Sequence, residues 1–232
     1  MQMEQAVSAK VALLQIGTPR PFGPNGVPSS MGRAQTADRV AVRALGFEGD
    51  RVGDPVFHGG PDKAVHAYPR AHYVDWRRDL PKTAALLVDG SFGENLTLNH
   101  LTERDICIGD VFACGPVRLQ VTQARQPCWK LNIRFDRRDM SRLVQDTGRT
   151  GWYFRVLEPG DIGAGDTLKL VQRPNPDWPL DRVWRLLYRE APDAVTLQAF
   201  AALEGLSASW QRLAARRLET LNVEDWSPRL DG

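Results

Sequence analysis

The sequence lacks long apolar runs and a large charge of one sign. No stretch approaches the roughly 18 consecutive apolar residues that a membrane-spanning helix needs, and the first ten residues, MQMEQAVSAK, lack the apolar core of a secretory signal. The formal net charge is +2 at pH 7, too small to indicate binding to a nucleic-acid polymer. We therefore expect a cytoplasmic protein with neither a membrane nor a nucleic-acid polymer as partner.

Cysteine is scarce as well. The chain has three cysteines, Cys107, Cys114 and Cys128, and no two of them form a Cys-x-x-Cys pair. An odd, widely spaced set argues against a disulfide framework and against a zinc site of four thiolates. His58 and His66 are too far apart and too isolated to make a convincing zinc pair.

What is present in residues 1–172 is mostly β-pattern. Short apolar runs with partial alternation are bounded by glycine and proline, which favours a closed or half-closed barrel over a doubly wound sheet. The strands are expected at 10–17, 38–45, 106–115, 115–124 and 161–171. Two helices are expected at 68–80, with Pro69 in the first turn, and at 136–148, ending near Gly148.

A proline-rich stretch, residues 173–179, indicates a linker. Beyond it, the segments 180–190, 193–205 and 207–221 each have helical periodicity. The predicted fold class is therefore a β-rich α+β protein, with a barrel-like body over 1–172 and a three-helix C-terminal subdomain over 180–232.

The segment QARQPCWKLN places one thiol among cations. Arg125 precedes Cys128 by three residues and Lys130 follows it by two, while Pro127 restricts the backbone between them. A thiolate is a nucleophile and a soft-metal ligand, and nearby cations favour it. The alternative is a buried structural cysteine, which describes Cys107 and Cys114 better because they lie in apolar runs without flanking cations.

Two further segments carry polar groups in unusual settings. His58, Gly59, Gly60 and Lys63 combine a flexible backbone with an imidazole and an ammonium, which suits a concave anion site, although a plain surface turn remains an alternative. The segment lacks the spacing of a Walker loop. Asn95 lies in a strand-like run, although asparagine is a poor strand former. This suggests that its side-chain amide is kept there for its hydrogen bonds.

In this order, the segments GFEGD, HGGPDKAVHAYPRAHY, FGENLT, QARQPCWKLN and TGRTGWYFRVL resemble the MOSC domain, in its stand-alone YiiM type, over nearly the whole chain. The resemblance implies a barrel-like fold that binds the molybdenum cofactor, Mo-molybdopterin. It also implies reduction of N-hydroxylated compounds such as 6-hydroxylaminopurine, with electrons from a separate flavoprotein reductase.

The resemblance also implies roles for individual residues. Cys128 is the expected metal ligand, and Cys128 and His58 are the expected catalytic residues, His58 as a proton donor because imidazole titrates near neutral pH. Arg125 is expected to hold an anionic oxygen, and Asn95 to pair with a pterin edge. The expected cofactor-binding set is His58, Gly59, Gly60, Lys63, Asn95, Arg125, Cys128 and Lys130.

Other functions stay open at this point. The same pocket would serve a molybdenum cofactor carrier without turnover, or a sulfur carrier that uses Cys128 as a persulfide. We expect that the helical tail does not build the cofactor pocket and instead covers the surface of the body or docks the electron donor. Its residues Arg212, Arg216 and Arg217 are expected either to form a solvated face or to meet an acidic surface of the flavoprotein.

Overall fold

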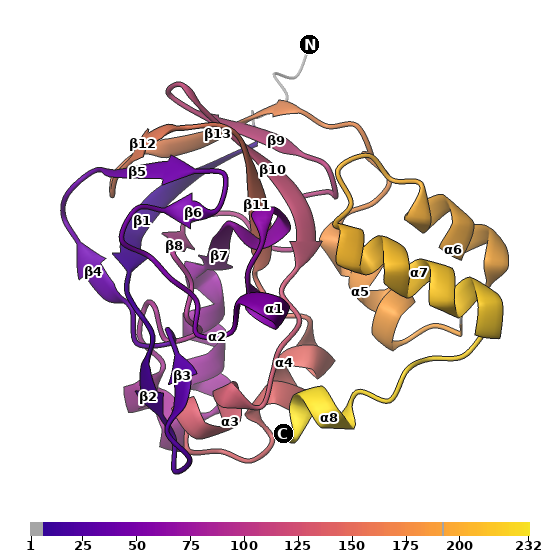
Figure 1. Cartoon of the computed structure of the whole chain (residues 1–232), viewed down its shortest axis with the longest axis horizontal. Coiled ribbons are helices and arrows are strands. Elements are labelled where there is room, and N and C mark those ends of the chain that lie inside the picture. The colour runs from indigo at the N-terminus through magenta and orange to yellow at the C-terminus, as the bar shows by residue number, and fades with distance from the viewer. Residues whose placement is uncertain (1–6, 192) are drawn as a thin grey trace.

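The body of the molecule is a β-barrel closed by its first strand (Figure 1). The computed structural model describes residues 7–191 and 193–232. The barrel strands follow one another in the order β13-β9-β10-β11-β7-β8-β1, and pairing of β1 with β13 completes the ring. Their bounds are β1 Ser8–Ile16, β7 Val65–Pro69, β8 Leu96–Leu98, β9 Val111–Cys114, β10 Val117–Ala124, β11 Trp152–Glu158 and β13 Thr167–Gln172.

Strand β1 pairs with two strands along one edge. Its first residues pair with β13 and its last residues pair with β4 (Ala34–Thr36), while β8 lies along the other edge. Strands β7 and β8 are parallel, so the loops that precede them reach the same end of the barrel. Two small sheets complete the β-structure: β12 (Gly160–Ile162) with β5 (Val40–Arg43) and β6 (Gly46–Phe47), and β2 (Arg20–Phe22) with β3 (Val27–Ser29).

Two apolar clusters hold the body together. Inward-facing residues of the barrel strands, such as Val11, Leu119 and Phe154, are fully buried, and burial of each such side chain contributes roughly 1.5–3 kcal/mol. A second cluster is aromatic and lies against α2, where Tyr68 stacks on Phe92 with ring centroids 4.3 Å apart. The two clusters fix the barrel and the helices around it as one support for the loops at the barrel end.

Short helices surround the barrel. They are α1 Pro55–His58, α2 Arg70–Asp79, α3 Lys130–Arg134 and α4 Met140–Thr147, with 3-10 turns at Pro61–Lys63 and Pro81–Leu86. Helix α4 ends at Gly148, whose φ of +71° allows the left-handed turn expected there. Pro69 differs from the expectation: it is the last residue of β7 and precedes the helix instead of lying in its first turn.

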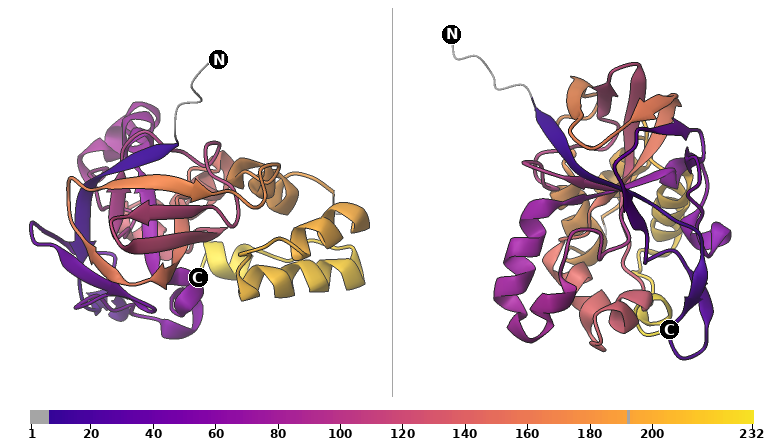
Figure 2. Two further views of the ribbon diagram at one scale, coloured as in Figure 1. Left: turned by 90° about the horizontal axis from the view of Figure 1, so that it is seen from above. Right: turned by 90° about the vertical axis from the view of Figure 1, so that its left-hand side faces the viewer.

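The C-terminal tail packs beside the body (Figures 1 and 2). The expected helices are present as α5 Leu180–Tyr188, α6 Ala194–Ala201 and α7 Ala208–Thr220, so the predicted fold class is confirmed. A short fourth helix, α8 (Ser227–Leu230), returns to the body beside α3 and α4 (Figure 1). No helix in the described parts of the chain combines the length and apolarity needed to cross a bilayer.

One of the three tail arginines does not lie on the surface. Arg217 is fully buried, pairs with Glu224 at 2.9 Å, and donates to the carbonyl oxygens of Leu186 and Leu187. The expectation that it lies on a solvated face is therefore wrong, because its guanidinium joins α5, α7 and the segment after α7. Arg212 and Arg216 are exposed, as expected.

We predict that Arg217→Ala lowers the free energy of unfolding by about 3 kcal/mol or more, because it leaves buried carbonyl groups and a carboxylate without their partner. Urea denaturation checks this. Arg185→Ala is the matched control: Arg185 forms a surface pair with Asp181, and its loss should cost less than about 1 kcal/mol. Equal losses in the two variants would contradict the structural role of Arg217.

Candidate functional site

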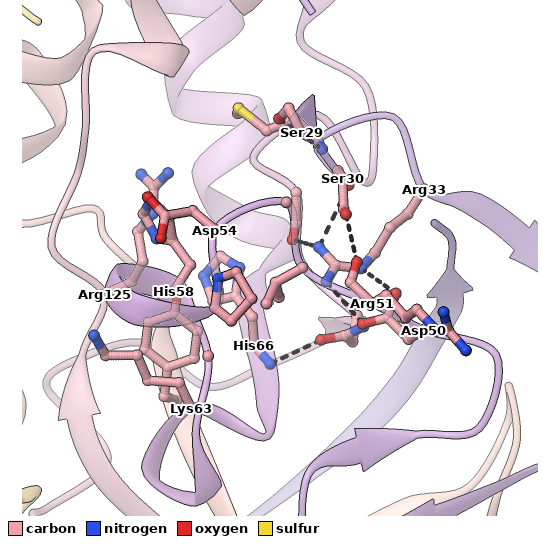
Figure 3. A pocket seen from close by; sticks show the side chains of 18 of the residues that line it. Ser29, Ser30, Arg33, Asp50, Arg51, Asp54, His58, Lys63, His66 and Arg125 are labelled. Carbon is pink, nitrogen blue, oxygen red and sulfur yellow. Dashed lines mark hydrogen bonds and ion pairs between the residues drawn. The ribbon is translucent and has the colours of Figure 1, made fainter. Parts of the chain in front are cut away.

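A pocket of about 390 Å³ opens at one end of the barrel. The pocket is lined by the segment 125–130, which links β10 to α3, by the loops before β7 and β8, by residues 29–33 and by Tyr153 of β11. The pocket brings together every residue predicted for the cofactor site. Those residues are His58, Gly59, Gly60, Lys63, Asn95, Arg125, Cys128 and Lys130. Figure 3 shows His58, Lys63 and Arg125 on one side and Arg33, Asp50 and Arg51 on the other, with His66 between.

Arg125 places a buried positive charge in this pocket. Arg125 is only 5% exposed, and its Nη1 atom has no hydrogen-bond partner within residues 7–191 and 193–232. No ion pair to Arg125 is found in that part of the chain either. A buried charge without a partner is strongly disfavoured. The pocket therefore offers a buried cation that an anionic group would stabilise.

His66 is a pocket residue that sequence reasoning missed. It is buried, its ring centroid lies 5.0 Å from that of Tyr153, and its Nε2 atom has no hydrogen-bond partner in the described structure. Burial and then the nearby Arg125 charge hold the pKa of His66 well below its usual value. A neutral imidazole with an open ring nitrogen suits a polar ligand atom. The sequence feature that could have indicated His66 is that it is the second histidine of the segment HGGPDKAVHAYP.

His58 behaves differently from the expectation. Burial, followed by the charges of Arg125, Lys130 and Lys63, lowers the pKa of His58 to about 4. Its imidazole is therefore neutral at pH 7 in the ligand-free protein, and does not titrate near neutral pH. An anion bound among these cations would weaken the causes that depress the pKa.

Asn95 is committed to the protein itself. Its Oδ1 accepts the backbone N–H of His66 at 3.0 Å, and its Nδ2 donates to Asp50 at 2.9 Å and to the carbonyl of Gln15 at 3.2 Å. These bonds use both amide hydrogens, so the structure does not support the expected pairing of Asn95 with a pterin edge. The side chain instead ties the strand that carries His66 to β1.

A buried ion pair between Arg33 and Asp50 holds the Asn95 side chain in place. Arg33 and Asp50 meet at 2.7 Å with side chains 8% and 7% exposed, and Arg33 also donates to the Gly93 carbonyl at 2.6 Å. Asp50 thus orients Asn95, and Arg33 holds the loop before it. Sequence reasoning missed this pair because its members are far from Asn95 along the chain.

The HGGPDK turn is built for shape more than for amide donors. The Gly59 N–H donates to the Pro55 carbonyl at 3.2 Å, so it is not available to an anion, and a Cβ there would lie 2.7 Å from that oxygen. Gly60 has a φ of +96°, which favours glycine. Lys63 donates to the Phe57 carbonyl at 2.6 Å, and burial lowers its pKa.

Cys128 is the one cysteine among the described residues that lines the pocket. It is 7% exposed and its carbonyl accepts the Leu131 N–H at the start of α3. Cys107 and Cys114 are buried elsewhere, and burial raises the pKa of each thiol to about 11, as suits inert structural cysteines. No group of three or more His, Cys, Asp or Glu side chains suited to a metal ion occurs in the described residues, so a metal at Cys128 would need ligands from a cofactor or solvent.

A second pocket of about 930 Å³ adjoins the first. His58, Lys63, Cys128 and Lys130 line both pockets. The opposite wall of the second pocket comes from the tail and consists of Ser209, Trp210, Arg212, Leu213, Arg216, Trp226, Pro228 and Arg229. Among the described residues, none from the tail lines the first pocket, which holds the predicted cofactor residues, whereas the tail does form part of the second pocket.

The tail reaches the site because α7 begins on the body. The Ala208 N–H donates to Asp62 at 2.9 Å, next to Lys63, and the Ser209 hydroxyl donates to the Gln123 side chain at 3.0 Å. Further along, Arg229 donates to the carbonyl of Pro127. The start of α7 and helix α8 are thus hydrogen-bonded to the segments that carry the expected site residues.

Comparison with known proteins assigns relatives to both parts of the chain. The MOSC domain model matches residues 54–169, and the YiiM-like 3-alpha helix domain model matches residues 178–221. Protein YiiM of Escherichia coli (strain K12) is 38% identical over 209 residues, which are 90% of this chain and 93% of that protein. The crystal structure of YiiM from Escherichia coli has a TM-score of 0.80 and 34% identity, covering 94% of this chain and 100% of the other.

A fungal protein extends the comparison. A protein of Gibberella moniliformis named Reductase is 39% identical over 163 residues, which are 69% of this chain but only 29% of the fungal protein. The similarity therefore lies within one portion of that longer protein.

We predict that the His58 imidazole in the ligand-free protein titrates near pH 4 and stays neutral from pH 7 to about 5, as measured by NMR of labelled histidine. Arg125→Gln should raise this pKa, because it removes a positive charge that disfavours the imidazolium. Since the neutral folded state binds fewer protons than the unfolded state, His58 lowers stability as the pH falls from about 6.5 toward 4. An unchanged pKa in Arg125→Gln would contradict the assigned cause.

Proposed function

The chain belongs to the MOSC domain family, and we propose that it is a molybdenum-cofactor-dependent reductase of N-hydroxylated compounds such as 6-hydroxylaminopurine. A flavoprotein reductase would supply the electrons. The family is associated in general with binding of the molybdenum cofactor, and one relative bears the name Reductase. The observation that carries the proposal is the buried Arg125 guanidinium, whose Nη1 has no hydrogen-bond partner among the described residues, in a pocket that Cys128 also lines.

The residues present fit such a cofactor. A soft thiolate from Cys128 suits molybdenum, and the orphaned Nη1 of Arg125 suits an anionic oxygen of the cofactor. His66 offers an open ring nitrogen for a hydrogen bond, and Lys63 and Lys130 add point charges to the pocket wall. When bound, the cofactor supplies the two-electron redox chemistry.

The net reaction is R–NHOH + 2e⁻ + 2H⁺ → R–NH₂ + H₂O. The N–O bond breaks, the departing hydroxyl group gains one proton and leaves as water, and the nitrogen gains the other proton. His58 lines both pockets and is the candidate to hold one of these protons. An anionic cofactor would offset the charges of Arg125 and Lys130, which depress the His58 pKa, so protonation of His58 is coupled to cofactor binding.

The second pocket favours turnover over simple transport. A cofactor carrier or a sulfur carrier needs one pocket around Cys128, whereas here a larger pocket shares that thiol with the first. Typical ligand pockets have roughly 300–1,000 Å³, so the larger one has room for a substrate beside the cofactor.

We predict that Cys128→Ser lowers the rate of 6-hydroxylaminopurine reduction by at least about a hundredfold. Mutation of residues that only hydrogen-bond to a metal ligand already lowers activity about 10–100-fold. The variant should also lose molybdenum, measured by metal analysis of the purified protein. Cys107→Ser and Cys114→Ser are the matched controls and should retain activity and metal. Full activity of Cys128→Ser at normal molybdenum loading would contradict the assignment.

We also predict that Arg125→Ala lowers cofactor occupancy about tenfold or more, because a buried charge-assisted hydrogen bond is lost. Arg125→Lys should restore it only in part, since an ammonium does not replace a planar two-pronged donor. Molybdenum and pterin content of the purified variants measure this. If both variants bind cofactor like the parent, Arg125 does not contact the cofactor.

A further inference from the structure

The wall that the tail contributes to the second pocket carries two free cations. Arg212 and Arg216 lie one helical turn apart on α7, so their side chains share a face. Both line the second pocket, both are exposed, and neither makes an ion pair with any residue that the structure describes. They are absent from the lining of the first pocket.

The second pocket as a whole has an excess of positive charge. Asp54 is the one acidic side chain among the described residues that line it, against five cations: Lys63, Lys130, Arg212, Arg216 and Arg229. These cations interact, since the Arg212 charge contributes to the lowered pKa of Lys63, after burial. A pocket lined by charges of one sign attracts a ligand of the opposite charge, here an anion. Arg125 in the first pocket is assigned to an anionic oxygen of the cofactor, which leaves these exposed cations available to a second anion.

The pocket also exposes an aromatic ring. Phe57 lies on the short helix α1 and is 70% exposed, although it is adjacent to His58 and lines the second pocket. Trp129, next to Cys128, lines the same pocket. Aromatic faces at a pocket wall bind planar rings by stacking. A large exposed aromatic side chain in the pocket that Cys128 also lines is therefore suited to hold a flat substrate.

We propose that the second pocket selects substrates in which a planar heteroaromatic ring carries a phosphate, as in a nucleoside monophosphate. The ring lies against Phe57 near Cys128, and the phosphate is bound by Arg212 and Arg216. The inference rests on the proposed reductase function and narrows its substrates to N-hydroxylated nucleotides in preference to free bases.

Calorimetric binding to the protein that carries its cofactor tests this without turnover. The probes are adenosine 5′-monophosphate (AMP), which is the product-like ligand, and adenosine, which lacks the phosphate. We expect AMP to bind at least about tenfold more tightly than adenosine, because charge-assisted hydrogen bonds to phosphate are the stronger kind. The double variant Arg212→Gln/Arg216→Gln should lose this difference and leave adenosine binding unchanged.

Two variants complete the design. The double variant Arg104→Gln/Arg138→Gln removes the same charge from exposed arginines that line neither pocket, and should keep the preference for AMP. Phe57→Ala should weaken AMP and adenosine by the same factor, because it acts on the ring. In turnover with an N-hydroxylated nucleotide, the Arg212/Arg216 variant should raise KM and leave kcat unchanged.

Three results would overturn the proposal. One is equal affinity for AMP and adenosine in the parent protein, and another is an equal loss in the Arg104/Arg138 variant. The third is an Arg212/Arg216 variant that keeps its AMP affinity but loses salt-dependent turnover with the flavoprotein, since the arginines would then bind the acidic donor. Arginine-dependent AMP binding without reduction of any N-hydroxylated compound would support this pocket and remove the reductase function instead.

Discussion

A buried guanidinium that forms no ion pair with the described residues is the constraint on which the site depends, because the fold must hold Arg125 in place against its tendency to reach water. The backbone N–H of Arg125 donates to the Gly151 carbonyl at 2.9 Å. The buried Glu103 carboxylate accepts the N–H groups of Thr150 and Gly151, and pairs with His72 at 2.7 Å. The segment TGRTGW of the family pattern thus has a physical role: a carboxylate fixes its turn, and the turn fixes the start of the Cys128 segment.

The same segment is held from the other side by the end of the chain. Arg229 donates to the Pro127 carbonyl, and the Trp129 N–H donates to the Arg229 carbonyl at 2.9 Å, so the two residues that flank Cys128 both bind α8. Arg217 anchors α7 to α5 from inside the tail. The tail therefore supports the segment that carries Cys128, and the proline-rich linker marks a change of secondary structure between two parts that contact each other.

Sequence reasoning found the fold class and eight of the residues that line the first pocket, because the segments that carry them are contiguous and each has its own local pattern. It missed what depends on pairing between distant segments. The amide of Asn95 bonds to Gln15 and Asp50, and barrel closure pairs Ser8 with Lys169. Such contacts are set by strand register, which local alternation does not specify. Likewise, periodicity placed Arg217 beside Arg216 on a helix without showing that only one of them faces the tail's core.

The depth of each cation explains how one positively charged site can serve two ligands. The chain carries a formal net charge of only +2, yet cations outnumber acids around both pockets, so the positive field is concentrated there. Arg125 is buried, where salt screens little and release of a bound anion would again leave the charge unpaired. Arg212 and Arg216 are exposed to solvent, where screening acts within about 8 Å at physiological ionic strength and an anion exchanges readily. Burial thus suits the first position to a resident cofactor, and exposure suits the second to a substrate that must enter and leave in every cycle.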